Sequence, residues 1–242
     1  MTELEQWVKE SQRAVFLGGA GVSTASGIPD FRSAHGLYRQ EKAGLSYEEM
    51  LSHGYFARHT EEFFRFYREV MLYPQAKPNA AHYALARLER AGKLRAVITQ
   101  NIDGLHQLAG SKNVLELHGS ELRNRCQRCG REYPGMEVVL QSEGVPRCPC
   151  GGVVKPEVVL YGESLDQALL GRAIRYVQEA DLLLVAGTSL VVYPVAGLVE
   201  YLGPGGKLAI LNRDPTPYDG RADLVLRGDL AQELESLAAA FS

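Results

Sequence analysis

The chain has 242 residues, of which 45% are hydrophobic and 23% are charged, values typical of a globular protein and not of a mainly disordered one. Its 26 basic and 29 acidic side chains give a formal net charge of −3, so there is no general basic field to attract nucleic acid. No apolar run approaches the roughly 20 residues that a membrane helix requires, and the N-terminal segment has no apolar signal core. We therefore expect a cytoplasmic protein without a membrane span.

The first predicted element is an amphipathic helix within residues 1–13, which places Leu4, Trp7 and Val8 on one side. Short apolar runs that end in glycine or in small polar residues then recur along the chain. Such runs are typical of parallel strands that are buried on both faces of a sheet. In chain order they occupy residues 14–17, 94–99, 114–117, 182–186, 207–211 and 224–226.

Helical patterns separate these predicted strands. Pro78 starts one pattern and Gly92 stops it, so a helix is expected over residues 79–91, and two others cover 165–179 and 194–202. Alternation of strands and helices predicts an α/β fold with a doubly wound parallel sheet. Ligands on such sheets bind at the carboxyl ends of the strands, where the candidate functional residues of this chain also lie.

Two stretches interrupt this alternation. Residues 35–74 are rich in aromatic and charged side chains and look helical, whereas residues 123–153 contain all four cysteines and show little periodicity. We predict that the two stretches pack together as a smaller domain with a helical module and a cysteine-rich module. The large domain would then be discontinuous and would comprise residues 1–34, 75–122 and 154–242.

A glycine-rich motif, GAGVS at residues 19–23, follows the first predicted strand. Glycines let a backbone approach a phosphate closely, and a helix N-terminus favours its negative charge. A dehydrogenase-type fingerprint would have a further glycine where Thr24 stands, and an acidic residue at the end of the next strand. The motif therefore predicts phosphate binding but disfavours an ordinary dehydrogenase. The alternative is a tight strand-to-helix turn without a ligand.

Further candidate ligand-binding segments contain polar side chains in loops or at strand ends. GIPDFR at residues 27–32 can form a lid whose arginine meets phosphate and whose phenylalanine covers a flat ring, or it is simply a loop. The amide and carboxylate side chains within residues 99–103 suit ribose hydroxyls and a carboxamide, or alternatively cap a helix. Residues 187–189 and Asn212 end two later strands and would hold more phosphate and an adenosine.

His118 follows the third predicted strand and precedes a glycine. The unperturbed pKa of histidine, about 6.5, suits proton removal near neutrality, so His118 is a candidate general base. The chain has 6 histidines, and a lone histidine is more often structural, which is the alternative role.

All four cysteines lie in two pairs, Cys126 with Cys129 and Cys148 with Cys150. Paired cysteines at this separation are typical of a zinc ribbon closed by four thiolates. Such a site has no open position for water, so the zinc would be structural and not catalytic. The second pair is one residue shorter than the usual spacing, and a redox-active pair is the alternative.

Taken together and in this order, these segments resemble the sirtuin family. The resemblance extends from residue 15 to about residue 234 and rests on GAGVS, GIPDFR, PNAAH, TQNIDGLH, LHG, the cysteine pairs, KPEVVLYGE, GTSLVVYP and ADLVLRGD. It implies a Rossmann-like large domain, a small domain made of a zinc ribbon and a helical module, and NAD as a consumed co-substrate. It also implies removal of acetyl or other neutral acyl groups from protein lysine side chains, with release of nicotinamide and O-acyl-ADP-ribose.

The resemblance further implies roles for individual residues. Those around the NAD phosphates and the adenosine half would be Ala20, Gly21, Ser23, Gly187, Thr188, Ser189, Asn212 and Asp229. Those around the nicotinamide and its ribose would be Ile28, Asp30, Phe31, Arg32, Gln100, Asn101, Ile102 and Asp103. His118 would be the general base and would act together with Asn101 and Asp103.

The implied partner is an acyl-lysine protein segment that binds as an extended strand. Val159, Leu160 and Tyr161 would line the acyl-lysine tunnel, and Phe64 and Tyr67 would contribute from the helical module. Sirtuins that remove acidic acyl groups carry Tyr-x-x-Arg at the positions of Phe64 and Tyr67, so a preference for neutral acyl groups is expected. We expect a monomer without direct nucleic-acid binding.

Two other functions fit the same pattern. An NAD-dependent ADP-ribosyltransferase would share the cleavage of nicotinamide but would direct water or a side chain to the ribose. A non-enzymatic NAD sensor would keep the fold but would not need the set Asn101, Asp103 and His118. A labelled-NAD transfer assay separates the first alternative from deacylation.

Overall fold

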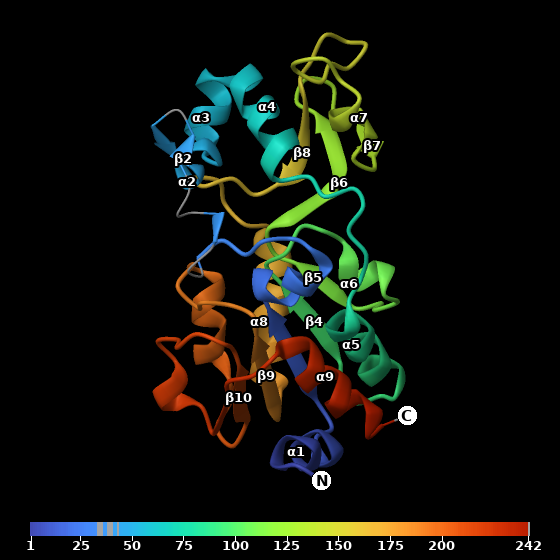
Figure 1. Ribbon diagram of the computed structural model, residues 1–242, viewed down its shortest axis with the longest axis vertical. Helices are drawn as coiled ribbons and strands as arrows, with labels where there is room; N and C mark the ends of the chain where they lie inside the picture. The colour runs from blue at the N-terminus through green and yellow to red at the C-terminus, as the bar shows by residue number, and fades with distance from the viewer. Residues whose placement is uncertain (33–35, 38–40, 43, 242) are drawn as a thin grey trace.

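The computed structural model describes residues 1–32, 36–37, 41–42 and 44–241. Figure 1 shows a larger part built on one sheet and a smaller part above it, with both chain termini at the larger part. The predicted domain boundary between residues 34 and 35 lies outside the described residues. Within those residues no helix is both long and apolar enough to cross a membrane.

A sheet of six parallel strands forms the larger part, in the order β11-β10-β9-β1-β4-β5. The strands are β1 (Ala14–Gly18), β4 (Ala96–Thr99), β5 (Val114–Glu116), β9 (Leu182–Ala186), β10 (Lys207–Leu211) and β11 (Leu224–Leu226). Alternate residues enter two cores: Ala14 and Phe16 pack on one face, and Val15 and Leu17 on the other. Burial on both faces explains why the apolar runs are continuous.

Helices cover both faces of this sheet. One face carries α1 (Glu3–Glu10), α5 (Ala80–Arg90) and α9 (Leu230–Ala239), and the other carries α8 (Gln167–Glu179) and the 3-10 segment η4 (Val195–Tyr201). Leu4, Trp7 and Val8 of α1 are buried together, as the amphipathic pattern predicts. The architecture is therefore the predicted doubly wound α/β fold. Two further short elements of this part are α6 (Leu105–Leu108) and η5 (Asp219–Arg221).

The smaller part contains two modules. The helical module comprises β2 (Glu41–Lys42), β3 (Leu45–Ser46), α2 (Tyr47–Met50), α3 (His53–Arg58) and α4 (Thr60–Val70). The cysteine-rich module comprises β6 (Gly119–Cys126), β7 (Glu132–Pro134), α7 (Glu137–Leu140) and β8 (Val154–Val158), with the sheet order β7-β6-β8. The two modules share one core, because Phe63 and Phe66 of α4 cluster with Val139 of α7 and Val158 of β8.

Candidate active site

The order of the strands in the large sheet reverses between β1 and β9. In doubly wound sheets, ligands bind at the carboxyl ends of the strands beside such a switch point. A cavity of about 950 Å³ lies at this position. Its walls come from the segments that follow the sheet strands and from the helical module, so it lies between the two parts of the molecule.

The loops after β1 and β9 meet at the switch point with almost no space between them. Gly21 donates its N–H to the carbonyl of Gly187 over 2.8 Å, and a Cβ on Gly21 would lie 2.7 Å from the Cα of Gly187. Gly187 has a φ of +61°, and a Cβ there would lie 2.6 Å from the backbone nitrogen of Val22. Both positions therefore require glycine, because two backbones pack directly against each other.

The GAGVS motif leads into two short 3-10 segments, η1 (Ala20–Val22) and η2 (Thr24–Ser26), and not into a long helix. The N–H groups of Gly19, Val22 and Ser23 already donate to protein carbonyls. These three N–H groups are therefore not available to a phosphate in this structure. The loop's contribution to the cavity is a wall of small residues that a ligand can approach closely.

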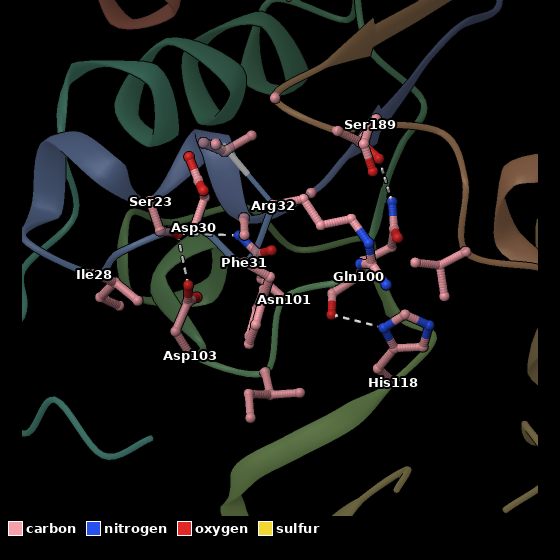
Figure 2. Close-up of a pocket in the computed structure, with 18 of the residues that line it drawn as sticks. Ser23, Ile28, Asp30, Phe31, Arg32, Gln100, Asn101, Asp103, His118 and Ser189 are labelled. Carbon is pink, nitrogen blue, oxygen red and sulfur yellow. Dashed lines mark hydrogen bonds between the residues drawn. The ribbon is translucent and has the colours of Figure 1, made fainter. Parts of the chain in front are cut away.

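Ser23, Asn101 and Asp103 form a hydrogen-bonded cluster on one wall of the cavity (Figure 2). The Ser23 hydroxyl donates to Oδ2 of Asp103 over 2.6 Å and accepts a hydrogen bond from Nδ2 of Asn101 over 3.0 Å. Oδ1 of Asp103 accepts the N–H of Leu105 over 2.9 Å. Burial raises the pKa of Asp103, whereas these two donors oppose the rise because they stabilise the carboxylate.

His82 lies behind this cluster and was not selected by the sequence analysis. The N–H of Asn79 donates to Nδ1 of His82 over 3.2 Å in a capping box at the start of α5. Nδ1 therefore carries no proton, so Nε2 does, and Nε2 lies 3.5 Å from the Ser23 hydroxyl. Burial lowers the pKa of His82 to about 4, which keeps the ring neutral at pH 7. The asparagine three residues before this histidine was the available sequence signal.

His118 and Gln100 form a second polar group in the cavity (Figure 2). Nδ1 of His118 lies 3.1 Å from the carbonyl oxygen of Gln100, which can only accept, so Nδ1 is protonated and Nε2 is the free base. Burial lowers the pKa of His118 below 6.5, and the contact with Gln100 opposes that change. The ring is therefore neutral near pH 7 and can accept a proton. The Gln100 side chain donates to Oγ1 of Thr188 over 2.9 Å, which links the ends of β4 and β9.

The loop after η2 brings the next four predicted residues to the same cavity. They are Ile28, Asp30, Phe31 and Arg32, which Figure 2 shows around the Ser23–Asp103 cluster. Nη2 of Arg32 donates to the hydroxyl of Tyr161 over 3.4 Å. This contact attaches the loop to the segment that follows β8.

The predicted adenosine-binding residues also reach the cavity. Gly187, Thr188 and Ser189 follow β9, Asn212 follows β10, and Asp229 precedes α9. Oδ1 of Asp229 accepts two N–H groups in the first turn of α9, over 3.0 and 3.1 Å. Asp229 is thus the N-cap of that helix, and this capping role accounts for an aspartate at its position.

The segment Val159, Leu160 and Tyr161 follows β8 and lines the cavity. Its backbone is held from both sides. The N–H of Val159 donates to the carbonyl of His118 over 2.9 Å, and the N–H of Tyr161 donates to the carbonyl of Leu51 over 3.0 Å. The segment therefore connects the candidate base with the helical module.

The structure separates Phe64 from Tyr67, although the sequence analysis assigned both to the acyl-lysine tunnel. Phe64 is fully buried against Phe56 and Phe63 and is not among the residues that line the cavity. Tyr67 does line the cavity, and its buried hydroxyl has no hydrogen-bond partner among the described residues. Positions three residues apart on a helix differ by about 60° around its axis, so the two rings meet different neighbours.

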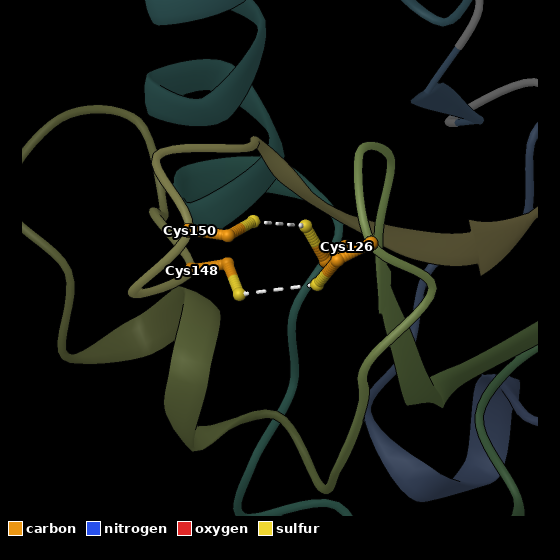
Figure 3. Close-up of side chains that lie close together, drawn as sticks. Cys126, Cys148 and Cys150 are labelled. Carbon is orange, nitrogen blue, oxygen red and sulfur yellow. Dashed lines mark hydrogen bonds between the residues drawn. The ribbon is translucent and has the colours of Figure 1, made fainter.

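The four cysteines converge in the cysteine-rich module, and none of them lines the cavity. The Sγ atoms of Cys126 and Cys150 lie 3.4 Å apart, those of Cys129 and Cys148 lie 3.6 Å apart, and all four lie within 4.8 Å of one another (Figure 3). Tetrahedral zinc with Zn–S bonds of about 2.3 Å needs sulfurs roughly 3.8 Å apart. The four thiol groups therefore fit one closed zinc site.

Two glycines accommodate the short second cysteine pair. Gly151 has a φ of +83° and donates its N–H to the carbonyl of Cys148 over 2.8 Å, which turns the chain tightly after Cys150. A Cβ on Gly152 would lie only 2.6 Å from Sγ of Cys126. The missing residue between the cysteines is thus offset by a left-handed turn and by a position without a side chain.

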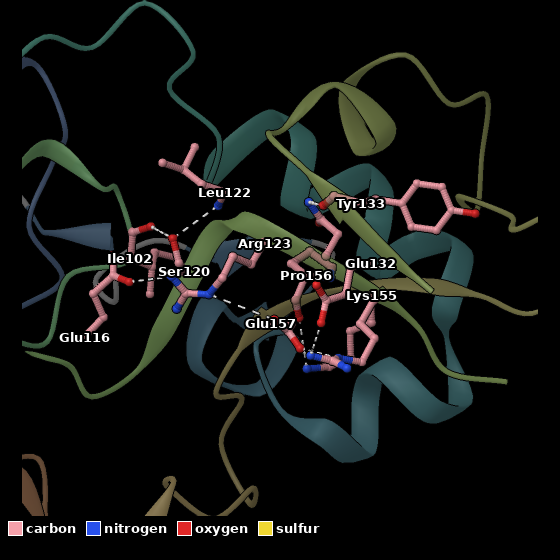
Figure 4. A network of polar contacts seen from close by, with 12 residues as sticks. Ile102, Glu116, Ser120, Leu122, Arg123, Glu132, Tyr133, Lys155, Pro156 and Glu157 are labelled. Atoms are coloured by element: carbon pink, nitrogen blue, oxygen red, sulfur yellow. Dashed lines mark hydrogen bonds and ion pairs between the residues drawn. The ribbon is translucent and has the colours of Figure 1, made fainter. Parts of the chain in front are cut away.

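Strand β6 connects the cysteine-rich module to the cavity (Figure 4). Arg123 on β6 donates to Glu116 at the end of β5 over 2.7 Å, and Glu116 is buried. At the start of β6, Oγ of Ser120 donates to the carbonyl of Ile102 over 3.4 Å. These contacts fix the first half of β6 against the segments after β4 and β5, directly beyond His118.

The fold, the switch-point cavity and the four-cysteine module define a nucleotide-binding α/β protein that carries a structural metal site. The Sir2 family model matches residues 19–194. The chain is 55% identical over 98% of its length to a Clostridium acetobutylicum protein named NAD-dependent protein deacetylase, of which 97% is covered. A Cutibacterium acnes protein of the same name is 54% identical, with 97% and 96% coverage. The chain belongs to the Sir2 family, which confirms the predicted sirtuin membership.

Solved Sir2 structures share the whole fold. A Sir2 complex with a p53 peptide and NAD⁺ matches with a TM-score of 0.88 and 43% identity, covering 99% of this chain and 97% of that one. A Sir2 variant with a deacetylated p53 peptide and 3′-O-acetyl-ADP-ribose gives a TM-score of 0.90 and 42% identity, covering 98% and 96%. The prediction of a Rossmann-like fold with a smaller zinc-ribbon part is thereby confirmed.

Proposed function

We propose that this protein is an NAD-dependent lysine deacylase that removes acetyl or other neutral acyl groups from proteins and releases nicotinamide and O-acyl-ADP-ribose. The observation that carries the proposal is the free Nε2 of a neutral His118 in the same cavity as the cluster of Ser23, Asn101 and Asp103. A base and a buried amide–carboxylate cluster in one cavity suit chemistry at a ribose ring. Relatives at 55% and 54% identity that are named NAD-dependent protein deacetylase support it.

His118 moves the proton in the proposed reaction. The acyl amide oxygen attacks the anomeric carbon of the nicotinamide ribose, and the bond to nicotinamide breaks with its electron pair leaving on the ring nitrogen. Nε2 of His118 then accepts the proton of a ribose hydroxyl, whose oxygen attacks the imidate carbon. The lysine nitrogen leaves as the free amine, and water completes the acyl-ADP-ribose. Because Nδ1 stays bonded to the Gln100 carbonyl, the ring carries the proton without changing its orientation.

The remaining assignments rest on one shared cavity. Asp103 and Ile102 would hold the nicotinamide carboxamide, and Gln100 and Asn101 would hold its ribose. The phosphates and the adenosine would contact residues that follow β1, β9, β10 and β11, namely Ala20, Gly21, Ser23, Gly187, Thr188, Ser189, Asn212 and Asp229. The loop that would cover the nicotinamide comprises Ile28, Asp30, Phe31 and Arg32. All of these residues line the cavity, which supports a single NAD site.

The proposed domain division assigns residues 1–34, 75–122 and 154–242 to NAD binding, and residues 35–74 and 123–153 to the smaller domain. Strand β6 of the cysteine-rich module crosses the boundary at 122, and strand β8 of the same module begins at the boundary at 154 and lies beyond it. The common core of α4 and α7 supports the smaller unit. The acyl-lysine segment would bind as an extended strand beside Val159, Leu160 and Tyr161. A related Sir2 structure that contains a p53 peptide and NAD⁺ supports a peptide partner. Zinc on the four cysteines would hold the β6–β8 module folded and would supply no open coordination position.

The test is mass spectrometry of an acetyl-lysine peptide incubated with the protein and NAD. We expect the deacetylated peptide, nicotinamide and O-acetyl-ADP-ribose in equal amounts, and none of the three without NAD. His118→Ala serves as the control for the proposed base. Transfer of labelled ADP-ribose to protein, with the acetyl group left on the peptide, would replace the proposal by ADP-ribosyl transfer.

A further inference from the structure

Glu163 is a partly buried carboxylate that the proposed chemistry does not use. It lines the cavity directly after residues 159–161, which are proposed to contact the acyl-lysine segment. Both of its side-chain oxygens take part in hydrogen bonds. Oε2 accepts the N–H of Leu160 over 2.9 Å and Nζ of Lys155 over 3.2 Å, and Oε1 lies 3.0 Å from Nδ1 of His53. One side chain therefore joins three separate stretches of the chain.

Lys155 is the cation of this group. It lies on β8 and is buried, and its Nζ also donates to the carbonyl oxygens of Pro156 and Val158 over 3.3 and 2.9 Å. All three hydrogens of the ammonium thus have an acceptor. Burial lowers the pKa of Lys155, whereas Glu163 opposes that change. A buried ammonium is costly without its counter-charge, so we expect the pair to persist in the folded protein.

The donors around Glu163 keep its carboxylate ionised. Burial would raise its pKa, but the N–H of Leu160, the ring of His53 and the ammonium of Lys155 outweigh burial and lower it. A carboxylate can only accept hydrogen bonds, so Nδ1 of His53 is the donor in their contact. His53 begins α3, and its backbone N–H donates to the carbonyl of Tyr161 over 2.9 Å. The helical module therefore holds the segment at two points.

The middle residue of the segment depends on Glu163. Within the described part of the chain, both backbone groups of Leu160 bond to Glu163 alone: the N–H donates to its carboxylate, and the carbonyl accepts its N–H over 2.9 Å. Leu160 is buried, so without the carboxylate its N–H would have neither a partner nor water. The attachment of the segment to Lys155 and to the side chain of His53 would be lost at the same time.

We propose that Glu163 is a positioning residue for the acyl-lysine protein, because its carboxylate holds residues 159–161 in the geometry that the peptide requires. The inference rests on the deacylase function proposed above and concerns the peptide side of that site. None of the three residues that Glu163 contacts belongs to the proposed NAD site. Loss of the carboxylate should therefore weaken peptide binding and leave NAD binding unchanged, a split that a general loss of stability does not produce.

The test measures KM for an acetyl-lysine peptide and for NAD from nicotinamide release, and Kd for the same peptide by fluorescence anisotropy. Glu163→Ala should raise KM and Kd of the peptide about 10-fold, the lower end of the worth of a hydrogen bond to a charged group, and should leave KM for NAD within about 2-fold. Glu163→Gln keeps an acceptor for Leu160 but leaves Lys155 without a counter-charge. Adding Lys155→Met removes that cation, so the double variant should recover most of the peptide affinity that Glu163→Gln loses.

Glu157→Gln is the matched control. Glu157 lies on β8 with Lys155 (Figure 4) and bonds Arg125 over 2.5 Å, but it does not line the cavity. This control should leave KM for the peptide and for NAD unchanged, and thermal unfolding shows whether each variant is folded. If Glu163→Ala is unfolded, Glu163→Gln with and without Lys155→Met gives the same decision.

The outcomes separate this inference from the proposed function. A folded Glu163→Ala that binds the peptide as tightly as wild type, or that raises KM for the peptide and for NAD by the same factor, overturns this inference alone. A wild type that binds the peptide but releases no nicotinamide overturns the proposed function, and the peptide Kd values then decide the inference. A wild type that binds no acetyl-lysine peptide overturns both.

Discussion

Replacing Glu121 by glutamine removes one buried titrating group and keeps the size of the side chain, so it isolates the cost of that group. The pKa of Glu121 is raised from its ordinary 4.5 to about 8 by burial and by the charge of Asp103. Below pH 4.5 the carboxyl is protonated in both the folded and the unfolded chain, and its contribution to stability is fully present. As the pH rises the unfolded chain ionises first, so the folded protein loses stability until the pH passes about 8.

The size of this effect follows from the same linkage. Each pH unit within the window corresponds to about 1.4 kcal/mol, so wild type should lose roughly 2–3 kcal/mol relative to Glu121→Gln between pH 5.5 and 7.5. Other titrating groups cancel in this difference because both proteins contain them.

Urea unfolding at three pH values across this window measures the free energy of unfolding for both proteins. Glu61→Gln is the control, because Glu61 is an exposed glutamate on α4, and its difference from wild type should stay flat. Parallel curves for wild type and Glu121→Gln would refute the reasoning, since the carboxyl would then not be held protonated. If Glu121→Gln instead becomes less stable than wild type as the pH rises, the carboxylate of Glu121 is paired in the folded protein.

The other expected results concern the base, the metal and the acyl group. His118→Ala should lower the rate of nicotinamide release about 10²- to 10⁴-fold, and near-normal turnover would exclude the role. Because burial lowers the pKa of His118 below 6.5, kcat/KM of the wild type should hold down to that pH and fall only below it; a loss that begins above pH 7 would contradict this. Purified protein should contain about one zinc per chain, and Cys129→Ala should unfold the cysteine-rich module, so a metal-free protein of unchanged stability would contradict the site. Acetyl-lysine peptides should exceed succinyl-lysine peptides in kcat/KM, and Tyr67→Arg should narrow the gap by bringing a guanidinium to the cavity. Phe64→Tyr should leave the gap between the two kcat/KM values unchanged. A succinyl preference in the wild type would refute the expected preference for neutral acyl groups.

The large sheet could be predicted from the sequence because its strands are buried on both faces. That environment produces unbroken apolar runs, such as residues 182–186, which coincide with β9. The run at 207–211 is β10 for the same reason. The type of helix at residues 194–202 was harder to predict, because the segment forms the 3-10 helix η4. Apolar spacing alone does not separate a 3-10 from an α-helix over so short a length.

The candidate site could be predicted in part, because polar residues directly after an apolar run mark the end of a strand. Asn101, Asp103 and His118 were found in this way, and they meet because parallel strands end at one edge. Phe64 was misplaced because its environment depends on how α4 packs against α3, a contact that no local pattern records. Glu121 gave no signal, since a glutamate early in a strand is usually exposed and only the packing of β6 against Ile102 buries it.

Asp103 and Glu121, two of the acids that line the cavity, differ in the donors that surround them. Asp103 accepts a hydrogen bond on each oxygen, from the Ser23 hydroxyl and from the N–H of Leu105, so its ionised form is stabilised despite burial. The direction of the Ser23 bond is itself enforced, because His82 and Asn101 both offer protons to that hydroxyl. Glu121 has no such donors and bears the charge of Asp103 as well.

Neighbouring acids whose environments push their pKa values apart take separate roles. In the proposed NAD site, Asp103 would be the acid beside the nicotinamide carboxamide, and two donors stabilise its carboxylate form. Burial is the main cause of the raised pKa of Glu121, and the charge of Asp103 adds to it. Asp103→Asn should lower the pKa of Glu121 and should also weaken nicotinamide exchange. If the charge of Asp103 does not act on Glu121, Asp103→Asn would leave unchanged the pH dependence of the difference in unfolding free energy that Glu121→Gln produces.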